Sequence, residues 1–129
     1  MELIGMWKVS EMNVVEVNKE TRSITRSWRT AEDIAADAGI NPMQKIFAQS
    51  FYKFEEDGTA FSLMPKELVP AGEGEPYDDS FVVAKKTQWK EEGGKLFIAA
   101  EEDGGLDWQE MLPAENGYEV FGYQRIVKA

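Results

Sequence analysis

Hydrophobic residues recur with a period of two from about residue 50 to residue 127, and this alternation limits the fold more than any other feature of the chain. Aromatic and β-branched residues alternate with polar ones in strand-length runs. The turn glycines Gly94, Gly105 and Gly117 follow at intervals of about 11 and 12 residues, which is typical of consecutive antiparallel strands. This part of the chain is therefore predicted to form an antiparallel meander. Its predicted strands are residues 51–55, 59–64, 80–89, 95–101, 106–112 and 117–127.

The first 50 residues are predicted to contain one more strand and a helical insert. Residues 3–17 alternate in the same way, and a slip near Met12 indicates a β-bulge or bend. Thr30 precedes an acidic, alanine-rich segment and is typical of a helix N-cap, while Asn41-Pro42 is typical of a second N-cap with proline at the first helical position. We therefore expect a short helix-turn-helix over about residues 28–48, between the first and second strands.

The pattern also fits a first helix that begins before Thr30. Ile24 and Trp28 fit its apolar stripe, and in that case Arg22, Arg26 and Arg29 follow i, i+4, i+7 spacing on one basic face. Two interpretations remain open for this face. It is either simply solvated, or it docks an anionic protein partner or the chain's own acidic half.

Residues 65–79 are predicted to form a mobile loop, because three prolines and two glycines lie among acidic residues there. A loop of about 15 residues without regular structure is uncommon in a compact domain. It either gates a site or is disordered.

The residue types present exclude several classes of function. The 129 residues include 24 acidic and 14 basic side chains, for a net charge of −10, with no histidine and no cysteine. Nucleic acid is a poor partner for such a surface. Disulfides, thiol nucleophiles, thiolate or imidazole zinc sites and the commonest general base are also excluded. We therefore expect no nucleic-acid partner, no cofactor and no metal ion, and we favour a container over a catalyst.

The acidic excess lies in one part of the chain. Residues 67–119 carry fourteen acids against four lysines, whereas residues 1–30 carry four acids and five bases. The acids cluster in the predicted turns, where solvated charge opposes edge-to-edge aggregation. This charge is interpreted as a solubility feature of a hairpin-rich protein.

Length and hydropathy limit the number of domains and the membrane segments that the chain can contain. Its 129 residues suit a single domain. No apolar run approaches the roughly 18 residues of a membrane helix, so no integral membrane segment is expected. The N-terminal residues lack a basic region followed by an apolar one, so a cytoplasmic location is expected, unless an export signal has been removed.

About eight antiparallel strands with short connections must protect their edges, and closure is the simplest way to do so. The expected fold is therefore mainly β, a single antiparallel up-and-down β-barrel of about eight strands. Eight strands enclose an interior that side chains fill or that holds one small ligand.

Several residues resemble a known superfamily. Gly5-Met6-Trp7 on the first strand resembles the Gly-x-Trp signature of the calycins, the lipocalin and fatty-acid-binding-protein relatives, and the chain is similar to small bacterial lipocalin-like domains. Tyr52-x-Phe54-x-x-Asp57-Gly58-Thr59 and the late Arg125 add to the likeness. The resemblance implies a lipocalin-like barrel in which Gly5, Trp7 and Arg125 form a structural signature, with Arg125 packed over Trp7.

Aromatic and polar residues of the predicted strands supply candidate ligand contacts. Tyrosine and tryptophan combine an apolar body with a polar group, which suits the wall of a cavity. For Arg125, two roles remain open: a cap on Trp7, or a fork that holds a ligand carboxylate beside Tyr123. We predict no catalytic residue. The predicted ligand-binding residues are Tyr52, Phe54, Phe61, Trp108, Tyr123 and Arg125.

Three functions follow from this reading. The first is non-catalytic binding of a small, mostly apolar ligand, with the helical pair and residues 65–79 as the portal. The second is a protein-interaction scaffold with a side-chain-filled barrel. The third is a small-barrel enzyme in which burial beside Trp108 raises the pKa of Glu110 and Tyr123 or Arg125 acts as electrophile.

Overall fold

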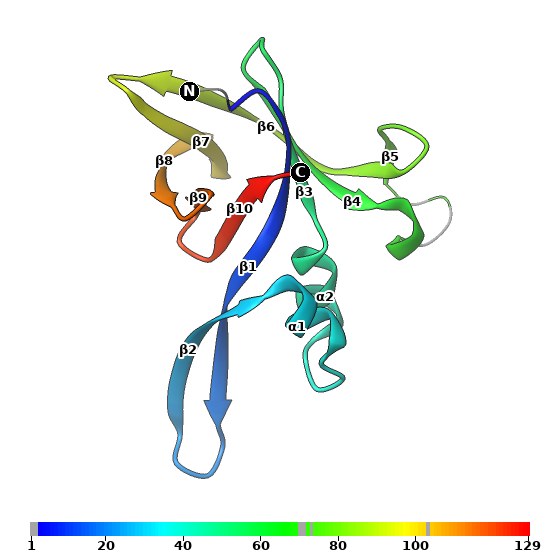
Figure 1. The fold of residues 1–129 in the computed structure, drawn as a ribbon, viewed down its shortest axis with the longest axis vertical. Coiled ribbons are helices and arrows are strands. Elements are labelled where there is room, and N and C mark those ends of the chain that lie inside the picture. Colours follow the sequence, from blue (N-terminus) through cyan, green and yellow to red (C-terminus); the bar gives the residue numbers. More distant parts are fainter. Residues whose placement is uncertain (1–2, 70–71, 73, 103) are drawn as a thin grey trace.

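The computed structural model describes residues 3–69, 72, 74–102 and 104–129, and it is mainly β (Figure 1). The described helices lack the length and hydrophobicity that a bilayer crossing requires. In chain order the elements are β1 (Gly5–Asn18), β2 (Ser23–Thr30), α1 (Ala31–Ala36), α2 (Pro42–Ala48), β3 (Phe51–Phe54), β4 (Thr59–Pro65), the 3-10 helix η1 (Lys66–Leu68), β5 (Glu75–Pro76), β6 (Phe81–Glu92), β7 (Lys95–Glu102), β8 (Gly105–Ala114), β9 (Gly117–Val120) and β10 (Gln124–Lys128).

Eight of these strands close into an antiparallel barrel, which confirms the expected fold class. The hydrogen-bonded order runs β1-β3-β4-β6-β7-β8-β9-β10, and β10 pairs back onto β1. Each strand follows its predecessor with only β2, β5 and the helices between, so the barrel is an up-and-down meander. Closure pairs the first and last strands of the meander, β1 and β10, with each other.

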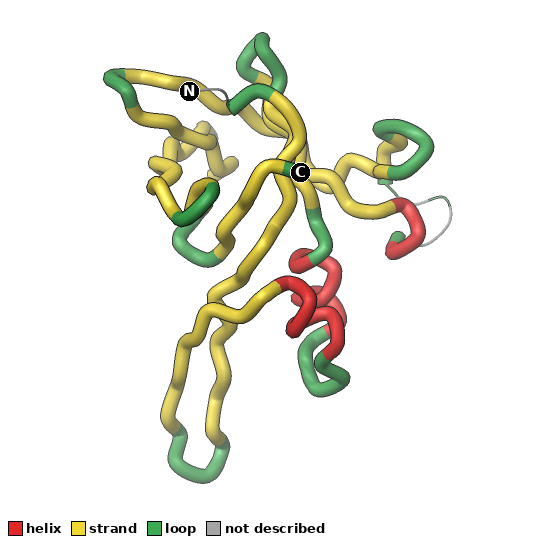
Figure 2. Tube along the Cα trace, viewed as in Figure 1, coloured by secondary structure: helices red, strands yellow, loops and turns green. Residues whose placement is uncertain are grey.

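Strand β1 belongs to two structures at once. Its first part pairs with β3 and β10 in the barrel wall, and its second part, Glu11–Asn18, pairs with β2. The register slips between Val9 and Glu11, close to the slip predicted near Met12. Beyond this bulge the β1–β2 hairpin, residues 13–28, leaves the barrel as a projecting arm (Figure 2).

The arm corrects the prediction of an early helix. Residues 23–30 form β2 and not helix, so Arg22, Arg26 and Arg29 do not share a helical face, and the helical pair lies between β2 and β3. The cross-strand pair Val17 and Ile24 shows why, because two β-branched side chains opposite each other favour a strand.

Both predicted helix caps are confirmed. The Thr30 side chain accepts a hydrogen bond from the Asp33 amide, and the Asn41 side chain accepts one from the Met43 amide. Each cap satisfies an amide that the first helical turn leaves without a partner.

Two further predictions needed correction. The run 117–127 is a hairpin of two strands, because Phe121 and Gly122 adopt positive φ angles of 57° and 76° and turn the chain between β9 and β10. The predicted loop 65–79 contains η1 and the short strand β5, which pairs with β6. Pro70, within that loop, lies outside the described residues.

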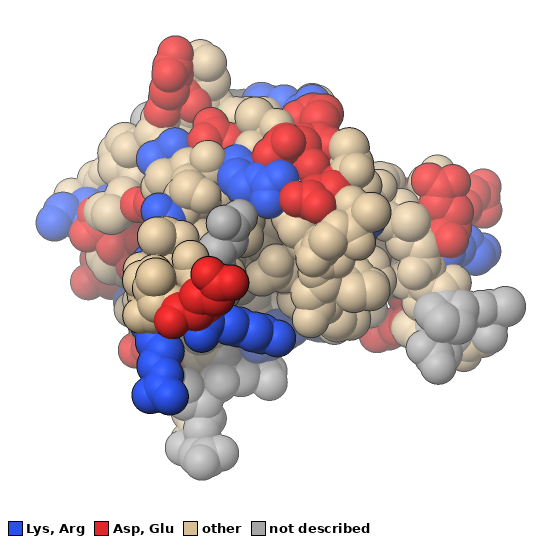
Figure 3. Space-filling model, turned by 90° about the horizontal axis from the view of Figure 1, so that it is seen from below, with Lys and Arg blue, Asp and Glu red and all other residues tan. Residues whose placement is uncertain are grey.

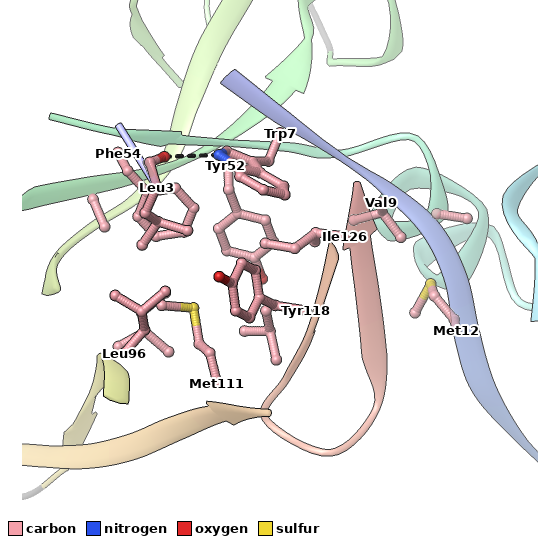
Figure 4. Close-up of a cluster of buried hydrophobic side chains, with 14 of the residues drawn as sticks. Leu3, Trp7, Val9, Met12, Tyr52, Phe54, Leu96, Met111, Tyr118 and Ile126 are labelled. Carbon is pink, nitrogen blue, oxygen red and sulfur yellow. Dashed lines mark hydrogen bonds between the residues drawn. The ribbon is translucent and has the colours of Figure 1, made fainter. Parts of the chain in front are cut away.

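The core fills the end of the barrel where the chain begins (Figure 4). Trp7 is buried there; its indole nitrogen donates to the Leu3 carbonyl at 2.7 Å, and its ring meets Tyr118 edge-on at 5.7 Å. Phe54 and Ile126 complete the packing without exposed surface. Gly5 begins β1 with a φ of +128°, which side chains rarely adopt. Buried side chains therefore pack this end of the barrel.

The pairing of β9 with β10 depends on a close backbone approach at Gly117, and this gives a first prediction. A Cβ there would lie 1.8 Å from the Ile126 carbonyl oxygen, so Gly117→Ala must push β9 and β10 apart. We expect a loss of more than about 2 kcal/mol in the free energy of unfolding, measured by urea denaturation. Gly105→Ala is the matched control, because nothing lies within 4 Å of its Cβ. Equal losses in the two variants would contradict this account of the β9–β10 pairing.

Candidate ligand-binding cavity

The barrel wall is incomplete along one seam. β6 and β7 pair only where residues 89–92 meet residues 95–98. Within the described chain, residues 81–88 of β6 have no ladder partner in β7. They pair with β4 on one side, and on the other side only Val82 and Val83 have a ladder partner, in β5. A side-chain hydrogen bond from Thr87 Oγ1 to the Ala99 carbonyl, at 2.8 Å, spans the gap. The two halves of the wall therefore separate at the end opposite the core.

A cavity of about 320 Å³ lies at this open end. Its lining comes from α2, β3, β4, β6, β7, β10 and the turn between β9 and β10, and most of it is apolar. Its apolar side chains include Phe47, Met64, Ile98 and Phe121. Small residues such as Ala60 leave the space open, because a larger side chain at this fully buried position would fill it.

One hydrogen-bonded pair of side chains makes part of the cavity wall polar. The Tyr52 hydroxyl donates to Gln124 Oε1 at 2.5 Å, and both side chains are buried. The Gln124 amide nitrogen makes no hydrogen bond to any described residue, which leaves a donor at the cavity wall. A donor in this position favours a ligand with an oxygen or nitrogen acceptor.

Burial raises the pKa of the two tyrosines of the cavity. Loss of hydration raises the pKa of Tyr52 well above its usual range, and the nearby Tyr123 adds to the effect. Burial raises the pKa of Tyr123 as well. At neutral pH both phenols are therefore hydrogen-bond donors and acceptors without charge.

The lining of the cavity includes one basic residue. Lys85 of β6 belongs to the lining and is exposed, and no described carboxylate lies within ion-pair distance of its Nζ. None of the lining residues is acidic. The cavity therefore tolerates a neutral ligand and an anionic substituent better than a cationic one.

Three of the six predicted ligand-binding residues line this cavity, namely Tyr52, Phe61 and Tyr123. Phe54 lies deeper, in the core, with its ring stacked 6.2 Å from Tyr52. Trp108 lies on the outer face of β8, where the ammonium of Lys90 sits 4.5 Å from its ring. A period of two assigns residues to two faces of a strand but does not say which face is inside.

Arg125 also lies outside the cavity lining. Its guanidinium stacks 3.9 Å from the Trp28 ring and bonds Glu11 at 3.2 Å, so its aromatic partner is Trp28 and not Trp7. The turn at residues 121–123 explains the difference. β10 begins at Gln124, and its alternation sends Gln124 and Ile126 inward and Arg125 outward.

The helical pair borders the opening through one residue. Phe47 of α2 lines the cavity, whereas no described residue of the predicted loop 65–79 does. Gln124 was missed because the sequence shows a single run over 117–127, with no sign of the turn other than Gly122. Phe47 was missed because helix α2 is too short for its apolar face to indicate what it covers.

Glu110, the carboxylate of the enzyme hypothesis, is remote from the cavity. It lies on the outer face of β8, where its carboxylate is 3.7 Å from the Lys95 ammonium. Glu110 and Trp108 lie on the same face of β8, as the alternation of the sequence predicts, but that face points outward.

Comparisons of this chain with family models, with curated proteins and with solved structures found no match.

The Tyr52–Gln124 bond generates a stability prediction. Tyr52→Phe leaves the Gln124 carbonyl buried without its donor and should cost about 1–3 kcal/mol in the free energy of unfolding. Tyr123→Phe is the matched control, because this side chain is 45% exposed, and it should cost less than about 0.5 kcal/mol. Urea denaturation at pH 7 measures both. A smaller loss in the Tyr52 variant would mean that the bond does not hold the wall.

The raised pKa of Tyr52 generates a pH prediction. Above about pH 10 the unfolded chain loses its tyrosine protons before the folded chain does, so the unfolded state binds fewer protons and stability falls as pH rises. In Tyr52→Phe this fall should be shallower between about pH 10 and pH 11. Denaturation midpoints across that range test it, and an unchanged slope would contradict the assignment.

Proposed function

We propose that the protein binds a small, mostly apolar ligand at the open end of its barrel, without catalysing a reaction on it. The observation that carries the proposal is the combination of an apolar cavity with one buried, hydrogen-bonding polar pair. Ligand pockets characteristically place few polar groups in a mostly apolar wall, and 320 Å³ lies at the lower end of their usual volumes.

The expected ligand follows from the wall. Aromatic side chains at Phe61, Phe121 and Tyr123 favour a flat or cyclic apolar body. The Gln124 amide favours one acceptor group on that body, and Lys85 tolerates a negative charge near the opening. The calycin resemblance at Gly5-Met6-Trp7 is consistent with this role, because it too implies a ligand-holding barrel.

The enzyme alternative receives less support. A catalytic carboxylate must reach the bound molecule, and the cavity lining contains none. Glu110 already pairs with Lys95 on the opposite side of the barrel wall. A container for a ligand is therefore the function that the geometry supports best.

Binding is tested with N-phenyl-1-naphthylamine, a neutral aromatic probe whose fluorescence rises in an apolar site. We expect saturable binding at one site. Ser62→Phe should weaken it at least about tenfold, because Ser62 lines the cavity and a phenyl ring there occupies it. Ser80→Phe, at an exposed position outside this cavity, is the control. Absence of uptake by the unmodified protein, or equal binding by both variants, would refute the proposal.

A further inference from the structure

A β-bulge in β6 directs a lysine to the cavity. Ser62 of β4 lies opposite Lys85 of β6. Its neighbour Leu63 lies opposite Val83, which leaves Ala84 without a partner in β4. Ala84 and Lys85 both belong to the cavity lining, although successive residues of a regular strand point to opposite faces. Bulges are frequent beside functional sites, where they redirect a side chain.

A hydroxyl group lies beside this ammonium group. Ser62 is the cross-strand partner of Lys85, and such partners share one face with their Cβ atoms about 5 Å apart. Both residues line the cavity. Among the described residues, the Ser62 hydroxyl has no hydrogen-bond partner and the Lys85 ammonium has no ion-pair partner. One wall of the cavity thus offers a cation and a hydrogen-bond donor that the described part of the chain does not use.

Acidic side chains lie outside this wall. The chain has a net charge of −10, and acidic side chains occur at several separate places on the face shown in Figure 3. None of the described lining residues is acidic. Glu75 of β5 lies opposite Val83, which shares the outer face of the sheet with its partner Leu63. The positive charge of Lys85 is therefore not neutralised within the cavity.

We propose that the ligand is an aromatic acid whose single carboxylate lies between Lys85 Nζ and Ser62 Oγ at the opening of the cavity. The assignment rests on the proposed function, because the apolar body of the same molecule occupies the cavity. The ammonium group supplies a charge-assisted hydrogen bond, and the hydroxyl group donates a second one. One cation suits one negative charge. Arg125 cannot take this role, because it faces outward and pairs with Glu11.

Two competitors of nearly equal shape test the charge. 1-Naphthoate carries a carboxylate at pH 7, whereas 1-naphthamide is neutral. Each displaces N-phenyl-1-naphthylamine from the full chain at about 150 mM NaCl, which screens distant charges. We expect the inhibition constant of 1-naphthoate to be at least about fivefold lower. An equal or higher constant overturns the carboxylate site and leaves the proposed function in place, because the probe still binds. Absence of probe uptake refutes both.

Lys85→Met tests the assignment to this side chain. It should remove the preference for 1-naphthoate and change the affinity for the neutral probe less than about twofold, because methionine keeps an unbranched apolar stem. Lys86→Met is the matched control. It removes the same charge from the next residue, which is not part of the lining, and should keep the preference. Survival of the preference in Lys85→Met, or equal losses in the two variants, overturns the assignment.

Ser62→Ala tests the hydroxyl group. We expect it to lower the preference for 1-naphthoate at least about twofold, because the carboxylate loses one donor. Ser80→Ala, at an exposed position outside the cavity, should leave the preference unchanged. An unchanged preference in Ser62→Ala removes Ser62 from the proposed site and overturns its two-residue form.

Discussion

The pairing of β10 with β1 is the contact on which the rest of the structure depends. Without it the meander would be an open sheet with two unpaired edges, and Trp7 would lose the neighbouring strand that carries Ile126. On its other side β10 pairs with β9, and this hairpin leaves no room for a Cβ at Gly117. The bulge between Val9 and Glu11 then lets β1 leave the wall after closing it. One long strand thereby completes the barrel and begins the arm.

The two ends of the barrel differ because the strands pair unequally around it. At the core end, Leu3, Trp7 and Phe54 fill the interior, and every wall strand has a partner on both sides. At the other end β6 and β7 diverge, and small residues such as Ala60 and Ala99 leave a space that Tyr52 and Gln124 make partly polar. The proposed ligand site lies at the end of the barrel where β6 and β7 no longer form backbone hydrogen bonds with each other.

Much of the fold could be predicted from the sequence because alternation, turn glycines and caps are local signals. The helix caps at Thr30 and Asn41 and the strands from Phe51 onward follow from such signals. Strand β2 was missed because Ile24 and Trp28 fit a helical stripe as well as a strand, and only pairing with β1 decides between them. The site was half predicted for a related reason. Tyr52 and Tyr123 line the cavity, whereas Trp108 and Arg125 face outward, and the inward face of a strand is set by its partners and not by its own residues.

The central claim is that the open end of the barrel, and no other surface, takes up an apolar molecule. Methyl-resolved NMR during titration with N-phenyl-1-naphthylamine tests it most directly. The account predicts that the methyl signals of Ala60, Met64 and Ile98 shift together while those of Leu3 and Met111 in the solid core stay in place. Shifts confined to Val15, Val17 and Ile24 on the arm, or to Leu106 and Leu112 on β8, would contradict it.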